Sequence, residues 1–311
     1  MERKISLADV QKAVEEAYEQ FKSEKEGTID PRVAAESKAG TFGISVVLTD
    51  GRFVDKGDAD TLFALGPIAK VPVSAVLLSQ NTPDELVKKA CCCKGHCGCN
   101  DGKDKPELPF GRHGLRAVSA VVPQGDPEGK MAVISDMIVG LTGSEPAFSD
   151  ALYENYKAQT ASLDVVGKLA ECGYKLYDDA AQSVDEYSRL LSMKMSAKQV
   201  ATMGATVAAD GRNPYSGEYA FDGKIAQSVI TLMATRGKHF IKKWLMRTGL
   251  PAKKSFSGAI LAVLPGFGAI AAYAPEVDDK GVSVKGAQAI EYIANKLGLN
   301  VFASARVEVA K

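Results

Sequence analysis

The chain has 311 residues, of which 46% are hydrophobic, enough to bury one large core or two modest ones. Its 38 basic and 38 acidic residues cancel, which excludes a basic face for nucleic acid and a polybasic stripe for an anionic membrane. Residues 1–21 carry charges throughout and place apolar side chains at helical spacing, unlike a signal peptide. Five of the six cysteines fall in one decapeptide, so no disulfide framework is indicated. We therefore expect a cytoplasmic protein.

The period of the apolar residues changes along the chain. The N-terminal segment predicts a helix, and residues 41–58 then predict a β-hairpin around Asp50-Gly51, a dipeptide typical of type I′ turns. From about Pro67 to Thr248 the spacing is mostly helical. Residues 257–276 predict a second apolar hairpin with a Pro-Gly turn, and residues 284–298 predict a closing helix.

Strands thus lie at both ends of the chain and helices in the middle. The two end segments have only each other to pair with, so we expect an α+β fold with one antiparallel sheet, covered by the terminal helices. An all-helical domain is inserted in the middle of it. The predicted boundaries are 1–66 and 249–311 for the sheet domain and 67–248 for the helical domain, which includes a Cys-rich loop at 91–105.

The segment from Gly249 to Gly298, beginning GLPAKKSFSGAILAVLPG, resembles the serine-dependent glutaminases, whose pattern is GLPAKSGVGGGILAVVP. The strings GDADTLFALGPIAKV, MKMSAKQVATMGATVAADGRNPYSGE and LMATRG are also similar to that family. The resemblance covers most of the chain from Phe42 onward. It implies the β-lactamase and penicillin-binding-protein fold, a homo-oligomer, and hydrolysis of L-glutamine without a cofactor.

In the family, the string after GDAD carries a Ser-x-x-Lys motif, in which a desolvated lysine takes the proton of the attacking hydroxyl. Here Pro67 falls at the serine and Lys70 at the lysine. Proline has neither a hydroxyl nor the backbone N–H that the family's nucleophile contributes to its oxyanion hole. Loss of such a serine costs on the order of 10⁶ in turnover.

Proline is favourable at the first position of a helix, but a second proline at 72 would crowd a helix that began at Pro67. We therefore expect a re-registered or kinked helix start. Ser74 lies four residues after Lys70 and is the best substitute nucleophile, although it would sit one turn deeper. The alternative is that Lys70 is a retained family residue that has no catalytic role in this chain.

Other pocket positions depart from the family pattern. The family's tyrosine in YIP corresponds to Ile29-Asp30-Pro31, and Arg116 falls at a substrate-binding asparagine. Asn155 and Ser162 fall at a glutamate and an asparagine, so the partner of the substrate's α-ammonium is missing. A tyrosine becomes His239, and the family's KSGV corresponds to Lys253-Lys254-Ser255-Phe256. Only Lys70 and Tyr187 retain family positions.

These substitutions raise the question of a rebuilt site. If Arg116 and Lys254 converge beside Lys70, the pocket would favour a small anion such as a carboxylate or phosphate. His239 is one of three histidines, and a single histidine on an amphipathic helix is more often structural than catalytic.

The string CCCKGHCGCNDGKDK is the second distinctive feature. It supplies six soft donors, more than a tetrahedral Zn²⁺ site requires, and its glycines would let the backbone wrap an ion. The candidate ligands for Zn²⁺ or another soft metal are Cys91, Cys92, Cys93, His96, Cys97 and Cys99. A flexible, reduced loop without metal is the alternative.

Three classes of function stay open. The first is a glutaminase-family protein without hydrolytic activity that binds, senses or acts as a scaffold. The second is an active glutaminase that uses a replacement nucleophile. The third is a metal-handling protein that works through the Cys-rich loop.

Overall fold

The computed structural model describes residues 3–90, 112–123, 129–162, 164, 166–167, 170, 176–235, 238–303 and 307–309. Its centre is a five-stranded antiparallel sheet in the order β4-β3-β10-β9-β8. The strands are β3 (Gly43–Leu48), β4 (Phe53–Gly57), β8 (Ala252–Lys254), β9 (Ala259–Leu264) and β10 (Gly268–Tyr273). Strands β3 and β10 join the two hairpins along a register that runs from Gly43–Tyr273 to Leu48–Gly268. The predicted α+β fold, with its two ends paired in one sheet, is confirmed.

The first hairpin turns differently from the prediction. A type I′ turn needs positive φ at both central residues, but only Gly51 has it, at 86°. The backbone N–H of Leu48 donates to the carbonyl of Arg52, which closes a loop of three residues, Thr49 to Gly51. Such a loop combines an ordinary turn with one left-handed glycine. The predicted turn type was therefore wrong, although the place of the turn was right.

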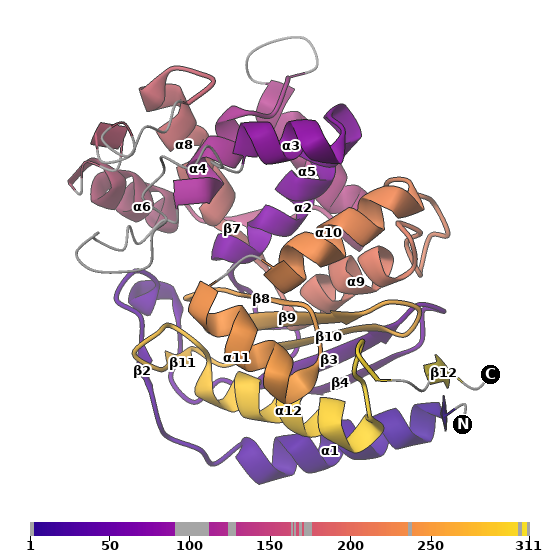
Figure 1. Ribbon diagram of the computed structural model, residues 1–311. Coiled ribbons are helices and arrows are strands. Elements are labelled where there is room, and N and C mark those ends of the chain that lie inside the picture. Colours follow the sequence, from indigo (N-terminus) through magenta and orange to yellow (C-terminus); the bar gives the residue numbers. More distant parts are fainter. Residues whose placement is uncertain are drawn as a thin grey trace.

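Helices cover both faces of the sheet, and Figure 1 shows this layering. Helices α1 (Leu7–Phe21) and α12 (Val284–Leu297) pack together on one face, and α11 (Lys238–Thr248) packs against α12. Helix α9 (Ala197–Ala208) lies on the other face. Because both faces are covered, β3, β9 and β10 are buried along their whole length and show no polar alternation.

The close approach of α9 to the sheet depends on Gly204. A Cβ atom placed on this residue would lie 2.5 Å from the Cβ of Ala269 and 2.6 Å from a methyl carbon of Leu261. Both neighbours are sheet residues. Because glycine has only a hydrogen atom as its side chain, Gly204 allows α9 to lie this close to the sheet.

The remaining helices form a block beyond α9. They are α2 (Lys70–Gln80), α3 (Pro83–Ala90), α4 (Arg112–Ser119), α5 (Gly129–Thr142), α6 (Asp150–Ser162), α8 (Ala180–Leu191) and α10 (Gly223–Thr235). This region also contains two short strands, β6 (Ala147–Phe148) and β7 (Met193–Met195), which pair with each other, and β7 also pairs with β5 (Phe63–Ala64). The prediction of an all-helical insertion missed them, because strands of two or three residues carry no readable periodicity. The predicted domain boundaries stay a prediction.

Two further pairs of short strands join distant segments. Strand β1 (Arg3–Ile5) pairs in parallel with β12 (Val307–Val309), and β2 (Thr28–Ile29) pairs with β11 (Glu276–Val277). The second pair leads into the 3₁₀ turn η1 (Ala34–Glu36). We call residues 28–37 the strap, because Figure 1 shows them running along one side of the molecule from the sheet toward α6. Among the described residues, no helix combines the length and apolar character needed to cross a bilayer.

Candidate functional site

The turn before α2 holds the Pro67-x-x-Lys70 string. Residues Gly66–Ala69 form the 3₁₀ turn η2, with Pro67 near its start, and α2 begins anew at Lys70. Pro72 therefore falls in the first turn of α2, where its missing N–H leaves no helical hydrogen bond unmade. The predicted re-registration is confirmed.

Lys70 is partly accessible to solvent, yet the surrounding protein strips most water from its amine. This desolvation lowers the pKa of Lys70 to about 8. Among the described residues no hydrogen-bond or ion-pair partner of the amine is found, and no charged group contributes to its shift. At pH 7 about a tenth of Lys70 is therefore a neutral amine.

The wall beside Pro67 comes from the loop after β8. Gly66 has a positive φ of 51°, and a Cβ atom on it would lie 2.5 Å from the Oγ of Ser255 and 3.4 Å from the ring of Phe256. Ser255 is fully buried, and its Oγ accepts hydrogen bonds from the backbone and hydroxyl of Ser257. This serine is thus occupied in holding its own turn, and Phe256 presents an aromatic edge at the turn that carries Pro67.

The strap adds a cation to the same wall. The guanidinium carbon of Arg32 lies 3.9 Å from the ring centroid of Phe256, and Tyr156 meets that ring edge-on at 5.8 Å. Asp30 accepts hydrogen bonds from the backbone and side chain of Arg32, the Nε contact being 2.8 Å. Burial raises the pKa of Asp30, but these hydrogen bonds outweigh it and hold the pKa below its usual value.

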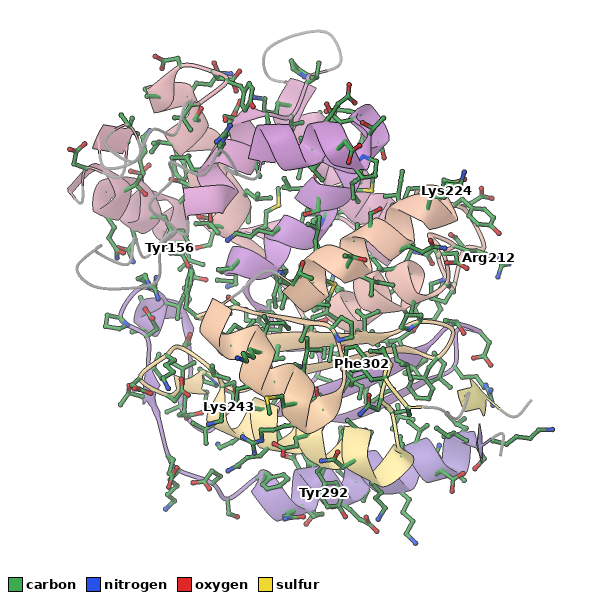
Figure 2. The ribbon with its side chains drawn as sticks, viewed as in Figure 1. Tyr156, Arg212, Lys224, Lys243, Tyr292 and Phe302 are labelled. Carbon is green, nitrogen blue, oxygen red and sulfur yellow. The ribbon has the colours of Figure 1, made fainter. Side chains whose placement is uncertain are left out.

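The strap is tied to the helical block by its own polar groups. The amide of Asn155 on α6 donates to the backbone carbonyl of Arg32 at 2.9 Å. Glu36 accepts a hydrogen bond from Ser149 and pairs with Lys194 at 2.5 Å. Figure 2 shows Tyr156 at the boundary between α6 and the layers below it. Both strap carboxylates, Asp30 and Glu36, are therefore engaged with protein partners.

The predicted pocket positions are only partly brought together. Tyr187 lies on α8, which packs against η2, and its hydroxyl sits so close to α4 that a Cβ on Gly114 would approach it to 2.2 Å. Burial raises the pKa of Tyr187, with a smaller opposing contribution from Arg32. Asn155 faces the strap, as described, and its carbonyl oxygen accepts from Gln159.

The two cations that were expected beside Lys70 make other contacts. The Nζ of Lys254 donates to the carbonyls of Lys280 and Gly281 at 2.6 and 2.9 Å. The guanidinium of Arg116 lies over the ring of Tyr177 at 5.7 Å and donates to its hydroxyl at 3.4 Å. Neither contact includes Lys70, so the predicted anion site gains no support from them and stays a prediction.

Three predicted features cannot be placed in the same detail. Ser162 ends α6 and His239 lies in α11, but their side chains are outside the described part of the chain. The six candidate metal ligands at 91–99 also lie outside the described residues. Within the described residues, no group of three or more His, Cys, Asp or Glu is arranged to hold a metal. Ser74 is partly buried on α2, one turn after Lys70.

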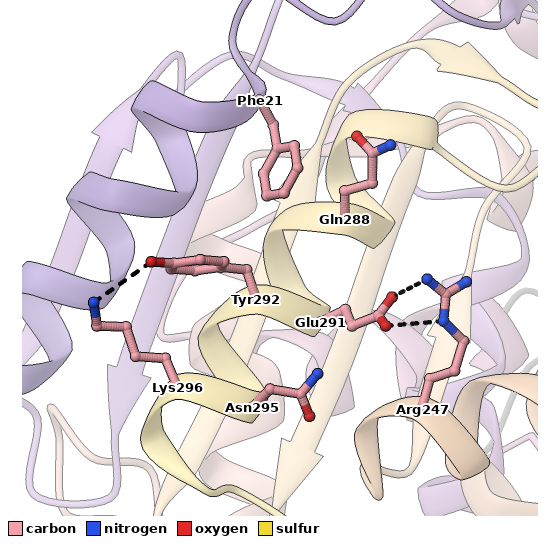
Figure 3. Close-up of a pocket in the computed structure, with 7 residues that line it drawn as sticks. All are labelled: Phe21, Arg247, Gln288, Glu291, Tyr292, Asn295 and Lys296. Atoms are coloured by element: carbon pink, nitrogen blue, oxygen red, sulfur yellow. Dashed lines mark hydrogen bonds and ion pairs between the residues drawn. The ribbon is translucent and has the colours of Figure 1, made fainter.

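A hollow of about 550 Å³ lies elsewhere, between α1, α11 and α12 (Figure 3). Its charged groups are paired: Arg247 Nε donates to Glu291 at 2.9 Å, and Lys296 pairs with Glu16. A smaller hollow of about 260 Å³ lies along α5. Neither hollow is lined by Pro67 or Lys70.

Comparisons with known proteins agree with this architecture. The sequence profile of the Glutaminase family matches residues 31–302. Curated glutaminases of Parabacteroides distasonis and Bacteroides fragilis are each 32% identical to this chain, over 99% of both sequences. A solved structure described as the probable glutaminase YbaS superposes with a TM-score of 0.83 at 28% identity, covering 96% of this chain and all of that one.

A second solved structure is the Bacillus subtilis glutaminase YbgJ in covalent complex with 5-oxo-L-norleucine, with a TM-score of 0.78 at 20% identity over 95% of this chain and 99% of that one. At that identity the likeness concerns the fold alone. Together with the sequence matches, it shows that the chain belongs to the glutaminase family and has its β-lactamase-like fold.

Sequence reasoning missed Arg32 and Tyr156 as members of the wall around this turn. Arg32 follows the Ile29-Asp30-Pro31 string, which was noted only for the tyrosine hydroxyl that it lacks. The spacing of Asp30 and Arg32 permits a local ion pair, which was a usable signal. Nothing in the local sequence indicated that this pair would stack on Phe256.

Proposed function

We propose that this chain is a glutaminase-family protein that does not hydrolyse L-glutamine and that keeps its pocket as a binding or sensing module. The observation that carries the proposal is Pro67 in the η2 turn, three residues before Lys70. At the place where the resemblance puts the nucleophile, this side chain offers no hydroxyl and this backbone offers no N–H. Attack and one oxyanion donor are thereby lost together.

The contacts of the wall support the same proposal. Recognition of an amino acid needs an acceptor for its ammonium group, because an unpaired buried charge costs several kcal/mol. Asp30 and Glu36 are already paired with Arg32 and Lys194, and the side chain of Asn155 holds the strap. Phe256 and Arg32 also occupy space beside the turn.

The second candidate is an active glutaminase with a replacement nucleophile, and Ser74 is the residue that would serve. Its place on α2, one turn beyond Lys70, is the observation in its favour. A cysteine of the 91–99 segment is the other candidate. Both require the neutral amine of Lys70 as the base, so loss of activity in Lys70→Ala would identify this class.

The decisive experiment measures ammonia release from L-glutamine by the purified chain. We expect no turnover above that of Lys70→Ala, and we expect Pro67→Ser to remain at least 10³-fold below an active relative because the ammonium partner is still missing. Intact-mass analysis after 6-diazo-5-oxo-L-norleucine, the reagent that labels the B. subtilis relative, should show no adduct. Enzyme-like turnover that disappears in Lys70→Ala would overturn the proposal.

Location, assembly and metal binding extend this proposal. We place the protein in the cytoplasm and expect it to be a homo-oligomer. Light scattering of the purified chain tests the oligomeric state. Binding of Zn²⁺ by the Cys-rich loop is tested by metal analysis after purification in reductant. The control replaces the cysteines at 91–99 by serine.

A further inference from the structure

Helix α11 carries an excess of positive charge, although the charges of the whole chain cancel. Its sequence, KHFIKKWLMRT, contains four lysine or arginine residues and no acidic residue. Ile241 and Trp244 are buried in the core beneath the helix. Lys242 and Lys243 are exposed, and neither forms an ion pair with a residue that the structure describes. The outer face of α11 therefore presents positive charge that the chain itself does not match.

The same face exposes an apolar side chain. Met246 is 81% exposed, the largest value among the bulky apolar side chains of the described residues. Residues three and four apart are neighbours on a helix, so Met246 lies beside Lys242 and Lys243, and Arg247 lies beside Lys243. We call Lys242, Lys243, Met246 and Arg247 the α11 patch. Methionine and arginine are enriched at protein interfaces, and Met246 contributes little to the core of its own chain.

The hollow of about 550 Å³ borders the α11 patch (Figure 3). Arg247 belongs to both, and its Nε reaches from α11 to Glu291 on α12 at 2.9 Å. One wall is aromatic: the ring centroids of Phe21 and Tyr292 lie 6.3 Å apart, with 75° between the ring planes. The Tyr292 hydroxyl donates to Glu16 at 2.7 Å, which leaves its ring for packing. Pockets of about 300–1,000 Å³ hold small molecules, so this hollow can receive an aromatic side chain.

We propose that the α11 patch and the hollow together bind an acidic segment of another protein, with carboxylates over Lys242 and Lys243 and one aromatic side chain in the hollow. Charge complementarity selects the acidic class, because exposed cations without partners attract carboxylates and repel lysine-rich segments. The hollow selects, within that class, a segment with an apolar anchor. None of these residues belongs to the turn that holds Pro67 and Lys70, so the inference does not depend on the proposed function.

Two other occupants fit the surface less well. In a second copy of this chain, the glutamates of α1 are already paired within their own molecule: Glu15 with Lys56, Glu16 with Lys296 and Glu19 with Lys22. An anionic membrane is bound by helices that place several apolar side chains beside their cations. Met246 is the one bulky apolar residue of α11 that is exposed in the described part of the chain.

The test measures the fluorescence anisotropy of a labelled glutamate-rich peptide with one central phenylalanine, titrated with the intact chain at low salt. We expect saturable binding that weakens as sodium chloride is added, because exposed charges are screened. Lys243→Glu should weaken binding about tenfold. Lys224→Glu is the matched control, since it reverses the charge of an exposed lysine on α10 (Figure 2), and it should change binding less than about twofold.

The apolar part of the surface is tested separately. Serine in place of the central phenylalanine of the peptide should weaken binding about tenfold. Met246→Ser should weaken it about threefold, whereas Tyr219→Ser, which removes an exposed side chain from the loop after α9, should leave it unchanged. Asn295 is exposed and lines the hollow, so Asn295→Tyr should fill the hollow and make the two peptides bind equally.

Absence of saturable binding, equal binding of a lysine-rich peptide, or an unchanged affinity in Lys243→Glu would overturn the inference. Tighter binding to phosphatidylserine vesicles than to the peptide, with the same dependence on Lys243, would overturn the choice of a protein partner. Equal affinity of the unsubstituted chain for the phenylalanine and serine peptides would overturn the role of the hollow, and that comparison needs no variant to fold. The readout contains no glutamine, so ammonia release would refute the proposed function without affecting this result.

Discussion

At the scale of the residue, the desolvated amine of Lys70 makes the stability of the folded chain depend on pH. The pKa falls from an ordinary value of 10.5 to about 8 on folding, so the folded chain binds this proton less tightly than the unfolded chain. The free energy of folding that is lost by desolvating the charged amine is at its full value below about pH 8, and the loss disappears as the pH rises toward 10.5. Lys70 thus destabilises the fold at neutral pH, as a residue retained for chemistry often does.

Replacement of Lys70 by methionine should therefore stabilise the chain at pH 7. We expect a gain of about 1–3 kcal/mol, because each pKa unit corresponds to about 1.4 kcal/mol and partial solvent access reduces the full difference. Urea unfolding at pH 7 and at pH 10 measures it, and the gain should shrink at the higher pH. Lys243→Met is the exposed control. An equal gain at both pH values would contradict the assigned cause.

Side-chain contacts with residues that are distant in the sequence could not be predicted from the sequence. The substitution at Pro67 follows from a short string and was anticipated, and the role of Lys70, as a base or as a relic, was left open. In contrast, Asn155 binds the carbonyl of Arg32, 123 positions away, and Lys254 turns to the carbonyls of residues 280 and 281. Long side chains take whichever acceptor the tertiary structure brings near, and local sequence does not specify that acceptor.

At the scale of the element, α9 is the helix whose packing is most restrictive. Gly204→Ala should destabilise the chain by about 2–3 kcal/mol, although alanine is the better helix former, because the added methyl would overlap Ala269 and Leu261. Chemical denaturation of the variant measures the loss.

The matched control for that prediction is Gly140→Ala on α5. There the added Cβ would meet its nearest neighbour, the Cβ of Ala220, at 3.2 Å, which a small adjustment relieves. We expect a change within about 1 kcal/mol of the unsubstituted chain, since helix propensity and crowding offset each other. Equal losses in both variants would show that close packing of α9 is not the cause.

Elements differ in how well the sequence predicted them. The two hairpins were predicted correctly because long apolar runs flank a glycine-containing turn. The type of the turn at Asp50-Gly51 was predicted wrongly. A three-residue loop and a two-residue loop share that dipeptide, and the choice depends on the register that β3 adopts in the sheet. Strands β5, β6 and β7 come from separate parts of the chain and meet only in the folded protein, where β7 lies between β5 and β6.

At the scale of the whole molecule, the sheet separates two apolar cores. Alternate residues of β9 face opposite sides, so Leu261 belongs to the core under α9 and Ile260 to the core under α1 and α12. The single tryptophan, Trp244, lies in the second core. Both cores use the same strands, so neither should unfold alone.

Leu261→Ala should therefore lower the unfolding midpoint seen by Trp244 fluorescence as much as the midpoint seen by far-UV circular dichroism. Leu-to-Ala truncation in a packed core costs about 2–5 kcal/mol. Ile260→Ala, on the other face of the same strand, is the control and should affect both signals in the same way. A shift in circular dichroism without a shift in fluorescence would show that the cores unfold separately.

The pairing of β3 with β10 has a consequence for synthesis of the chain on the ribosome. Gly43 leaves the exit tunnel long before its partner Tyr273 has been translated, and at about 5–20 residues per second the delay is tens of seconds. Until then the newly made β3, buried at every position in the finished protein, has no strand on its inner edge. The nascent first hairpin is therefore the segment that we expect a chaperone to shield.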